Sequence, residues 1–353
     1  MKGAIRAVRP LSSPRVLLLS GTPVSESPLN AYSVLKILDP DRIPGRTRFE
    51  NHFIQKAAVQ TGPVTINKPV GYTNLSELKT MIEAVSVRRL KCDIRGMPDR
   101  TEQTHVCQPT KEQAGHYAEI LRGILADIEG DPEWAKTLDL AVVKLLRLRQ
   151  VLSHPSILGL SGDSGKLLEL DGLVEEVLSN PAAKVVIWAT WNAEVDVVAR
   201  RYAAYKPVTI DQRTTQEELA ELEHTFDVSD QRIAIGTPQK AGTGVDWLAR
   251  ARTAIYIEKT YSLVSHRQSI DRIVRRVGDD NPGDSPAARR IKQIKRSGAT
   301  IIYLHVPNSV DDVVSYVLNR KIELGDSLLT SDRKLLEDGK LHLLQMLRGG
   351  MKL

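Results

Sequence analysis

The chain has 353 residues, 41% of them hydrophobic and 26% charged, a composition typical of folded proteins and unlike that of disordered or collagenous chains. A chain of this length predicts about two domains. Its apolar runs are only as long as strands, and residues 1–6 are not followed by an apolar segment, so neither a membrane span nor a secretory signal is expected. We therefore expect a cytoplasmic protein, with Cys92 and Cys107 as free thiols.

The charge distribution adds a second constraint. The net charge is +6, and residues 267–296 hold nine basic side chains against four acidic ones. This excess permits a polyanionic partner, although any single basic cluster, taken alone, is better explained as a solvated surface. Aromatic residues make up 5% of the chain, which gives little support for a surface that stacks unpaired bases.

Before residue 165 the hydrophobic pattern is mostly helical. Residues 15–20 predict a short buried strand that ends in the turn 21–23, and residues 101–107 alternate as a strand does. The helices predicted in this part cover 29–38, 47–57, 75–84, 110–128 and 133–152.

After residue 165 short apolar strands alternate with helices. This alternation predicts a parallel sheet with helices on both faces, in which ligands bind at the carboxyl ends of the strands. The predicted strands are 184–189, 208–211, 232–236, 254–258 and 300–306. The predicted helices are 166–179, 192–204, 215–226, 263–276 and 309–322, and residues 279–298 look like an exposed insertion.

The most informative segment runs from Gln268 to Arg275. Gln268, Arg272 and Arg275 are spaced i, i+4, i+7, so a helix places them on one face. A guanidinium is always charged and forms a bidentate fork with phosphate oxygens, so this face suits a transferring phosphoryl group. Taken alone, the segment is also compatible with a basic surface helix.

A second informative segment, residues 236–246, follows a predicted strand directly. Gly242 and Gly244 permit close backbone approach, and Thr237 and Thr243 offer hydroxyl groups. These features suit a loop that touches the phosphates of a nucleotide or of a nucleic acid. The loop is not a Walker A motif because the Gly-Lys-Ser/Thr ending is missing.

The order of such segments resembles that of the Swi/Snf-type DNA-dependent ATPases of helicase superfamily two. VLLLSGTP (16–23) is similar to the family's motif III, and VRRLKCDI (87–94) to its RR-x-K-x-D signature. LRLRQVLSHP (146–155) is similar to its LR-x-x-x-NHP block, with Ser153 in place of the usual asparagine. The remaining similar blocks are 29–40, 184–191 (motif IV), 241–248 (motif V), 268–275 (motif VI) and 309–312.

The resemblance implies an α/β fold: a RecA-like parallel sheet with helices on both faces (the second helicase lobe), preceded by a mainly helical region. It implies a trailing edge of a first lobe (1–23), a helical region (24–164), a second lobe (165–325) and a C-terminal helix (326–353). The implied catalytic residues are Arg272, Arg275 and Gln268. The implied ATP-binding or interlobe residues are Gly21, Thr22, Gly244 and Asp246. The implied DNA contacts are Thr190, Thr237, Gly242, Thr243, Arg88 and Arg89.

The sequence departs from the family's pattern in three places. The Walker A loop and the DEAH-type motif II would precede motif III and have no counterpart here. One extra residue precedes Gly278, Asp279 follows where glutamine is usual, and residues 279–298 are inserted. The resemblance therefore implies ATP as substrate, Mg²⁺ held by another lobe, double-stranded DNA as partner, a nucleoid or DNA-associated location, and activity only with a separate chain that supplies the first lobe.

Two other interpretations stay open on the sequence alone. The chain could be a non-catalytic DNA-binding or regulatory module derived from such a motor. It could also be an unrelated α/β protein that binds a nucleotide sugar or a cofactor. Walker A and DEAH-type motifs in the DNA upstream of codon 1 would favour the motor.

Overall fold

The structure, a computed structural model, describes residues 16–19, 28–61, 64–87, 99–130, 138–228, 231–242, 244–275 and 298–326. The chain divides into two compact units. The first unit comprises residues 1–90 and 316–349, and the second comprises residues 91–315 and 350–353. The predicted C-terminal helix falls, apart from residue 326, outside the described residues, as does most of the insertion 279–298.

The first unit combines three helices with a hairpin. The helices are α2 (Pro28–Leu38), α3 (Arg46–Phe53) and α4 (Leu75–Glu83), and β1 (Ile54–Thr61) pairs antiparallel with β2 (Val64–Tyr72). The helices share a small aromatic core, in which the ring of Phe49 lies 5.1 Å from that of Tyr32 and 4.5 Å from that of Phe53. Phe49 and Phe53 are spaced i, i+4 and therefore point to the same side of α3.

Two predictions for this part of the chain are wrong. The helix expected over 47–57 ends at Phe53, and β1 begins at Ile54, because residues 54–72 carry strand-forming Val, Ile and Thr around the turn-forming Gly62-Pro63. The buried strand expected over 15–20 is not found either. Its described part, 16–19, has no regular structure, and Leu17 and Leu19 are 82% and 89% exposed, since no described strand pairs with it.

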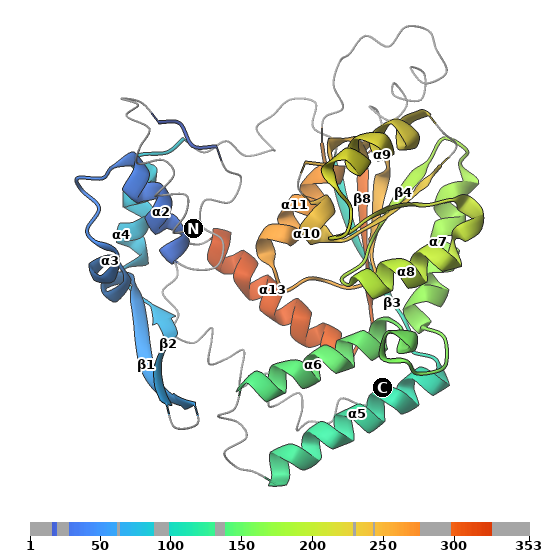
Figure 1. Cartoon of the computed structure of the whole chain (residues 1–353), viewed down its shortest axis with the longest axis horizontal. Helices are drawn as coiled ribbons and strands as arrows, with labels where there is room; N and C mark the ends of the chain where they lie inside the picture. Colours follow the sequence, from blue (N-terminus) through green and yellow to red (C-terminus); the bar gives the residue numbers. More distant parts are fainter. Residues whose placement is uncertain are drawn as a thin grey trace, which may run out of the picture. The chain divides into compact units, whose positions relative to one another are not determined.

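The second unit is built on a parallel sheet, as predicted, but the sheet has six strands because β3 joins the five that were expected in it (Figure 1). The strand order is β3-β8-β7-β4-β6-β5, and every neighbouring pair is parallel. The central strands are wholly buried, which their unbroken apolar sequences predict. The strands are β3 (Arg100–Val106), β4 (Lys184–Trp188), β5 (Val208–Ile210), β6 (Ile233–Gly236), β7 (Arg252–Tyr256) and β8 (Ala299–His305).

Helices cover both faces of this sheet. Figure 1 shows α10 (Pro238–Ala241) and α11 (Leu263–Ile273) on one face and α7 (Gly165–Ser179) and α8 (Asn192–Arg201) on the other. The α11 face has a core of alternate strand residues, Trp188 and Tyr256 among them, packed on Ile270 and Ile273. Trp188 is fully buried, so it belongs to the core.

The other elements of this unit lie before and between the strands. Helices α5 (Lys111–Gly130) and α6 (Leu138–Ser153) follow β3, which adds one strand to the sheet from the region 24–164. The remaining elements are η3 (Pro155–Leu158), η4 (Ala203–Tyr205), α9 (Gln216–Val228), η5 (Asp246–Arg250) and the start of α13 (Val310–Asp326). Among the described residues, no helix is both long enough and apolar enough to cross a membrane.

Candidate functional site

Helix α11 carries Gln268 and Arg272 of the predicted arginine face, but it ends at Ile273, so the helix is shorter than the 263–276 predicted and Arg275 lies just beyond its end. Ser262 caps its first turn by accepting a hydrogen bond from the amide of Ser265 at 3.3 Å. Leu263, Ile270 and Ile273 are buried against the sheet, which leaves the opposite side of the helix for polar residues. Gln268 and Arg272 are half-buried and lie one turn apart, as their spacing predicts.

The loop after β6 packs directly against this helix. Gly242 donates a hydrogen bond to the carbonyl oxygen of Pro238 at 3.1 Å. A Cβ at Gly242 would lie 2.2 Å from that oxygen and 3.5 Å from the amide nitrogen of Ser269 in α11. Because only glycine fits there, the loop backbone comes close enough for the Arg272 Nε to donate to the Gly242 carbonyl oxygen at 2.9 Å.

The two arginines of this face share one carboxylate. Asp246 Oδ1 accepts a hydrogen bond from Arg272 Nη1 and another, at 2.6 Å, from Arg275 Nη1. Their side chains are 18% and 44% exposed, and that of Asp246 is 57% exposed. Two guanidiniums against one carboxylate leave a net positive charge open to solvent, so this cluster can bind an anion with several oxygens.

The predicted site residues fall into two groups at opposite ends of the sheet. The arginine pair lies beside the amino end of β7, whose first residue, Arg252, donates to the carbonyl oxygen of Arg275 at 3.0 Å. Thr190 and Thr237 follow β4 and β6 at the carboxyl edge, where Ala189 donates to the Gly236 carbonyl oxygen at 2.9 Å. The two threonines therefore lie at the carboxyl ends of their strands and the two arginines do not, because α11 runs back along the sheet.

At the carboxyl edge both threonines are engaged. Thr237 is buried, and its hydroxyl donates to Gln212 Oε1 at 3.5 Å. The amide of Thr190 donates to Glu194 Oε2 at 2.5 Å, and Ser153 donates to the other oxygen of Glu194. Burial raises the pKa of Glu194, because a charged carboxylate is poorly solvated there.

Five other predicted site residues cannot be placed. Gly21, Thr22, Arg88, Arg89 and Thr243 lie outside the described residues. Gly244 is described and has a φ of +72°, a left-handed conformation that favours glycine. It lies between the arginine-binding Asp246 and the close contact at Gly242, so it is part of the loop that forms the arginine cluster.

Sequence reasoning missed a set of buried ion pairs at the carboxyl edge. Arg149 of α6 pairs with Glu258 at 2.8 Å, and Lys166 of α7 pairs with Asp311 at 2.8 Å. The guanidinium of Arg149 also lies 5.2 Å from the ring of Trp191 and 4.8 Å from that of Tyr261. A charge inside an apolar run, as in Gly-Lys-Leu-Leu at 165–168, is a signal that could have found them.

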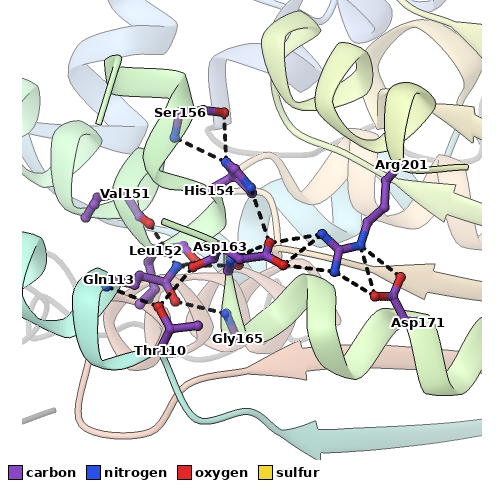
Figure 2. A network of polar contacts seen from close by, with 11 residues as sticks. Thr110, Gln113, Val151, Leu152, His154, Ser156, Asp163, Gly165, Asp171 and Arg201 are labelled. Atoms are coloured by element: carbon purple, nitrogen blue, oxygen red, sulfur yellow. Dashed lines mark hydrogen bonds and ion pairs between the residues drawn. The ribbon is translucent and has the colours of Figure 1, made fainter. Parts of the chain in front are cut away.

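A second polar network joins α5 and α6 to the start of α7 (Figure 2). Arg201 donates to both Asp163 and Asp171, with its closest contact at 2.6 Å. Gln113 donates to the carbonyl oxygen of Leu152 at 2.9 Å and accepts from the amide of Gly165 at 3.0 Å. These contacts hold the helical hairpin on the sheet and have no direct link to the arginine pair.

His154 lies in this network as a capping residue. Its Nδ1 accepts a hydrogen bond from the amide of Ser156 at 3.1 Å, at the start of η3. Its Nε2 lies 3.4 Å from Asp163. Burial lowers the pKa of His154, which favours the neutral ring that this cap requires.

Residues 2–157 match the family described as the SNF2-related domain. The resemblance to the Swi/Snf-type ATPases is confirmed. One relative is the mouse (Mus musculus) protein called SWI/SNF-related matrix-associated actin-dependent regulator of chromatin subfamily A member 1, which is 23% identical over 367 residues. That alignment covers 97% of this chain and 32% of the mouse protein, so the chain spans about a third of this relative.

Solved structures agree on the fold. The SWI2/SNF2 ATPase core of Sulfolobus solfataricus, solved in complex with dsDNA, has a TM-score of 0.51 and 16% identity, and the match covers 90% of this chain and 63% of that one. The C-terminal part of the Fun30 ATPase domain has a TM-score of 0.51 and 14% identity, and the match covers 72% of this chain and 100% of that one. The fold of the second unit is accordingly RecA-like α/β, as predicted.

Proposed function

We propose that this chain forms the second ATPase lobe of a Swi/Snf-type DNA translocase and supplies its arginine fingers. The observation that carries the proposal is the pairing of Arg272 and Arg275 on one oxygen of Asp246. Two guanidiniums that converge on a single carboxylate oxygen have the arrangement needed to converge on a phosphate oxygen. In phosphoryl transfer such arginines stabilise the charge of the transition state and contribute about 10³–10⁵ in rate.

The other site residues take supporting roles in this proposal. Gln268, one turn before Arg272, orients the attacking water or the first arginine. The loop with Gly242, Thr243 and Gly244 couples the DNA backbone to the nucleotide, because its glycine contact joins it to α11. Thr237 is buried, so it supports this loop through Gln212 and does not contact DNA as predicted. Gly21 and Thr22 relay between lobes, and Thr190, Arg88 and Arg89 contact double-stranded DNA without reading its sequence.

ATP itself is bound by a first lobe with Walker A and DEAH-type motifs, which this sequence does not contain. In such a site Mg²⁺ would neutralise the charge of the phosphates. Among the described residues, no three His, Cys, Asp or Glu side chains group as a metal site, so we assign no Mg²⁺ ligand to this chain. We propose that these residues support ATP hydrolysis only when a first lobe with those motifs completes the site.

The test is a DNA-stimulated ATPase assay of this polypeptide alone and with a first lobe from its own genome. The proposal predicts no turnover alone, turnover on mixing with duplex DNA, and loss of that turnover with Arg272→Ala. If the purified chain alone hydrolyses ATP, and Arg272→Ala abolishes that turnover, the proposed requirement for a first lobe is wrong. Salt-sensitive DNA binding without turnover under any condition would instead support a non-catalytic regulatory module.

A further inference from the structure

Arg252 has a backbone conformation and a degree of burial that are unusual for an arginine. It opens β7 with a backbone φ of +56°, a left-handed conformation that L residues other than Gly, Asn and Asp rarely adopt. Its side chain is almost buried, with 7% of the residue exposed. From there its Nη1 donates to the carbonyl oxygen of Arg275 at 3.0 Å.

This setting costs free energy. A strained backbone and a desolvated guanidinium are each unfavourable. Burial lowers the pKa of Arg252, and no carboxylate in the described part of the chain offsets that effect. Its Nε is buried and has no hydrogen-bond partner among the described residues. A favourable contact is needed to offset the strained backbone and the buried charge. The contact that the structure provides is the hydrogen bond to the Arg275 carbonyl oxygen.

Arg275 needs such a contact more than Arg272 does. Arg272 lies within α11, whose last residue is Ile273, and it also donates to the Gly242 carbonyl oxygen. Arg275 lies beyond the helix end, where its amide makes a short-range bond to the Ile273 carbonyl oxygen at 3.0 Å. A cation at the carboxyl end of a helix interacts favourably with the free carbonyl groups there.

We propose that Arg252 is a positioning residue that fixes the backbone of Arg275 and thereby sets where the second guanidinium stands. The inference rests on the proposed function, because Arg275 matters for turnover only if it is a finger. It makes an asymmetric prediction: loss of the Arg252 donor displaces Arg275 and leaves Arg272 in place. If Arg252 had a purely structural role, its loss would change the stability of the fold. It would not displace one guanidinium more than the other.

Arg252→Asn separates these two roles. Asparagine tolerates the left-handed conformation, so the change relieves strain and removes a buried charge, yet its side chain is too short to reach the Arg275 carbonyl oxygen. We expect the thermal midpoint to stay the same or rise. The matched control is Arg232→Asn, because Arg232 also donates to carbonyl oxygens at a helix end, those of Leu178 and Asn180 at 3.0 and 3.1 Å.

The first readout uses the chain itself and needs no ATPase activity. The side-chain Nε–Hε NMR signals of Arg272 and Arg275 are assigned with the variants Arg272→Lys and Arg275→Lys. In Arg252→Asn the Arg275 signal should shift or broaden while the Arg272 signal stays in place, and Arg232→Asn should move neither. An unchanged Arg275 signal, or an equal change in both signals, overturns the proposal.

The second readout is turnover in the assembled two-lobe enzyme. Misplacement of a catalytic group by about 1 Å can cost about 10²-fold, so we expect Arg252→Asn to lower kcat by about 10-fold with KM for ATP unchanged. Arg252→Lys, which keeps a donor, should recover part of the loss. An unchanged kcat in an active enzyme overturns the proposal. Absence of turnover in the wild-type assembly refutes the proposed function instead, and the NMR result then decides the role of Arg252.

Discussion

The two ends of the sheet in the second unit use the same chemistry for different purposes. At the carboxyl edge, Lys166 and Asp311 form an ion pair whose side chains are 0% and 8% exposed. At the amino end of β7, Asp246 holds two arginines while its own side chain is 57% exposed. A buried pair cannot exchange its partner for a ligand without large desolvation costs, whereas an exposed pair can. The difference indicates that the first cluster holds the fold and the second is available for chemistry.

The largest effect on stability is expected from Lys166→Met. The change leaves the Asp311 carboxylate buried without its cation, and breaking a buried pair in this way costs about 3–5 kcal/mol of unfolding free energy. Urea denaturation measures it. Lys111→Met, at an exposed position of α5, is the control and should stay within about 0.5 kcal/mol of wild type. Equal losses of unfolding free energy in the two variants would contradict a stabilising role of the buried pair.

Gly165→Ala tests how tightly α7 meets the segment before α5. A Cβ there would lie 1.8 Å from the carbonyl oxygen of Gln108, so the backbone must shift, at a cost of about 1–3 kcal/mol. Gly172→Ala in the same helix is the matched control, because a Cβ at Gly172 meets nothing within 4 Å. The control should gain up to about 1 kcal/mol from helix propensity. If both variants changed the free energy of unfolding in the same direction, the close packing at Gly165 would be contradicted.

Glu258 should make stability depend on pH. Burial raises its pKa from 4.5 to about 8, even though Arg149 acts in the opposite direction. The folded state thus binds the proton more tightly than the unfolded state, so this contribution to stability is complete below pH about 4.5 and is lost as the pH rises to about 8. The slope is at most about 1.4 kcal/mol per pH unit. Glu258→Gln should flatten the plot of unfolding free energy against pH between these limits. Parallel plots for the variant and the wild type would show that Glu258 is not the source of the slope.

The smallest effect on stability is expected at the exposed cluster. Asp246→Asn removes the shared carboxylate from a side chain that is more than half exposed, so the free energy of unfolding should change by no more than about 0.5 kcal/mol. Differential scanning calorimetry against Lys166→Met compares the two ends of the sheet directly. A loss at Asp246 as large as that at Lys166 would break the distinction between framework and site.

Much of the second unit could be predicted because its central strands are short apolar runs, β3 alternates as a strand does, and its helices have a regular period. The hairpin β1–β2 could not be predicted. The helix α3 passes directly into β1 at Phe53 and Ile54, and a short apolar pattern there fits a helix as well as a strand. The spacing of Arg272 and Arg275 predicted that the two arginines share one face of a helix, but α11 ends at Ile273 and their guanidiniums meet at Asp246 instead. Their shared partner Asp246 and the left-handed Arg252 depend on how the loop and β7 pack on α11, which no local pattern encodes.

The central claim is that Arg272 and Arg275 act together on one phosphoryl group. The most direct test is a double-mutant cycle on ATP turnover in the assembled enzyme, with Arg272→Ala, Arg275→Ala and the double variant. Residues that act as a unit are strongly non-additive. We predict that each single change lowers turnover by about 10³-fold or more, and that the double variant is hardly worse than either. Small losses that multiply in the double variant would contradict the claim.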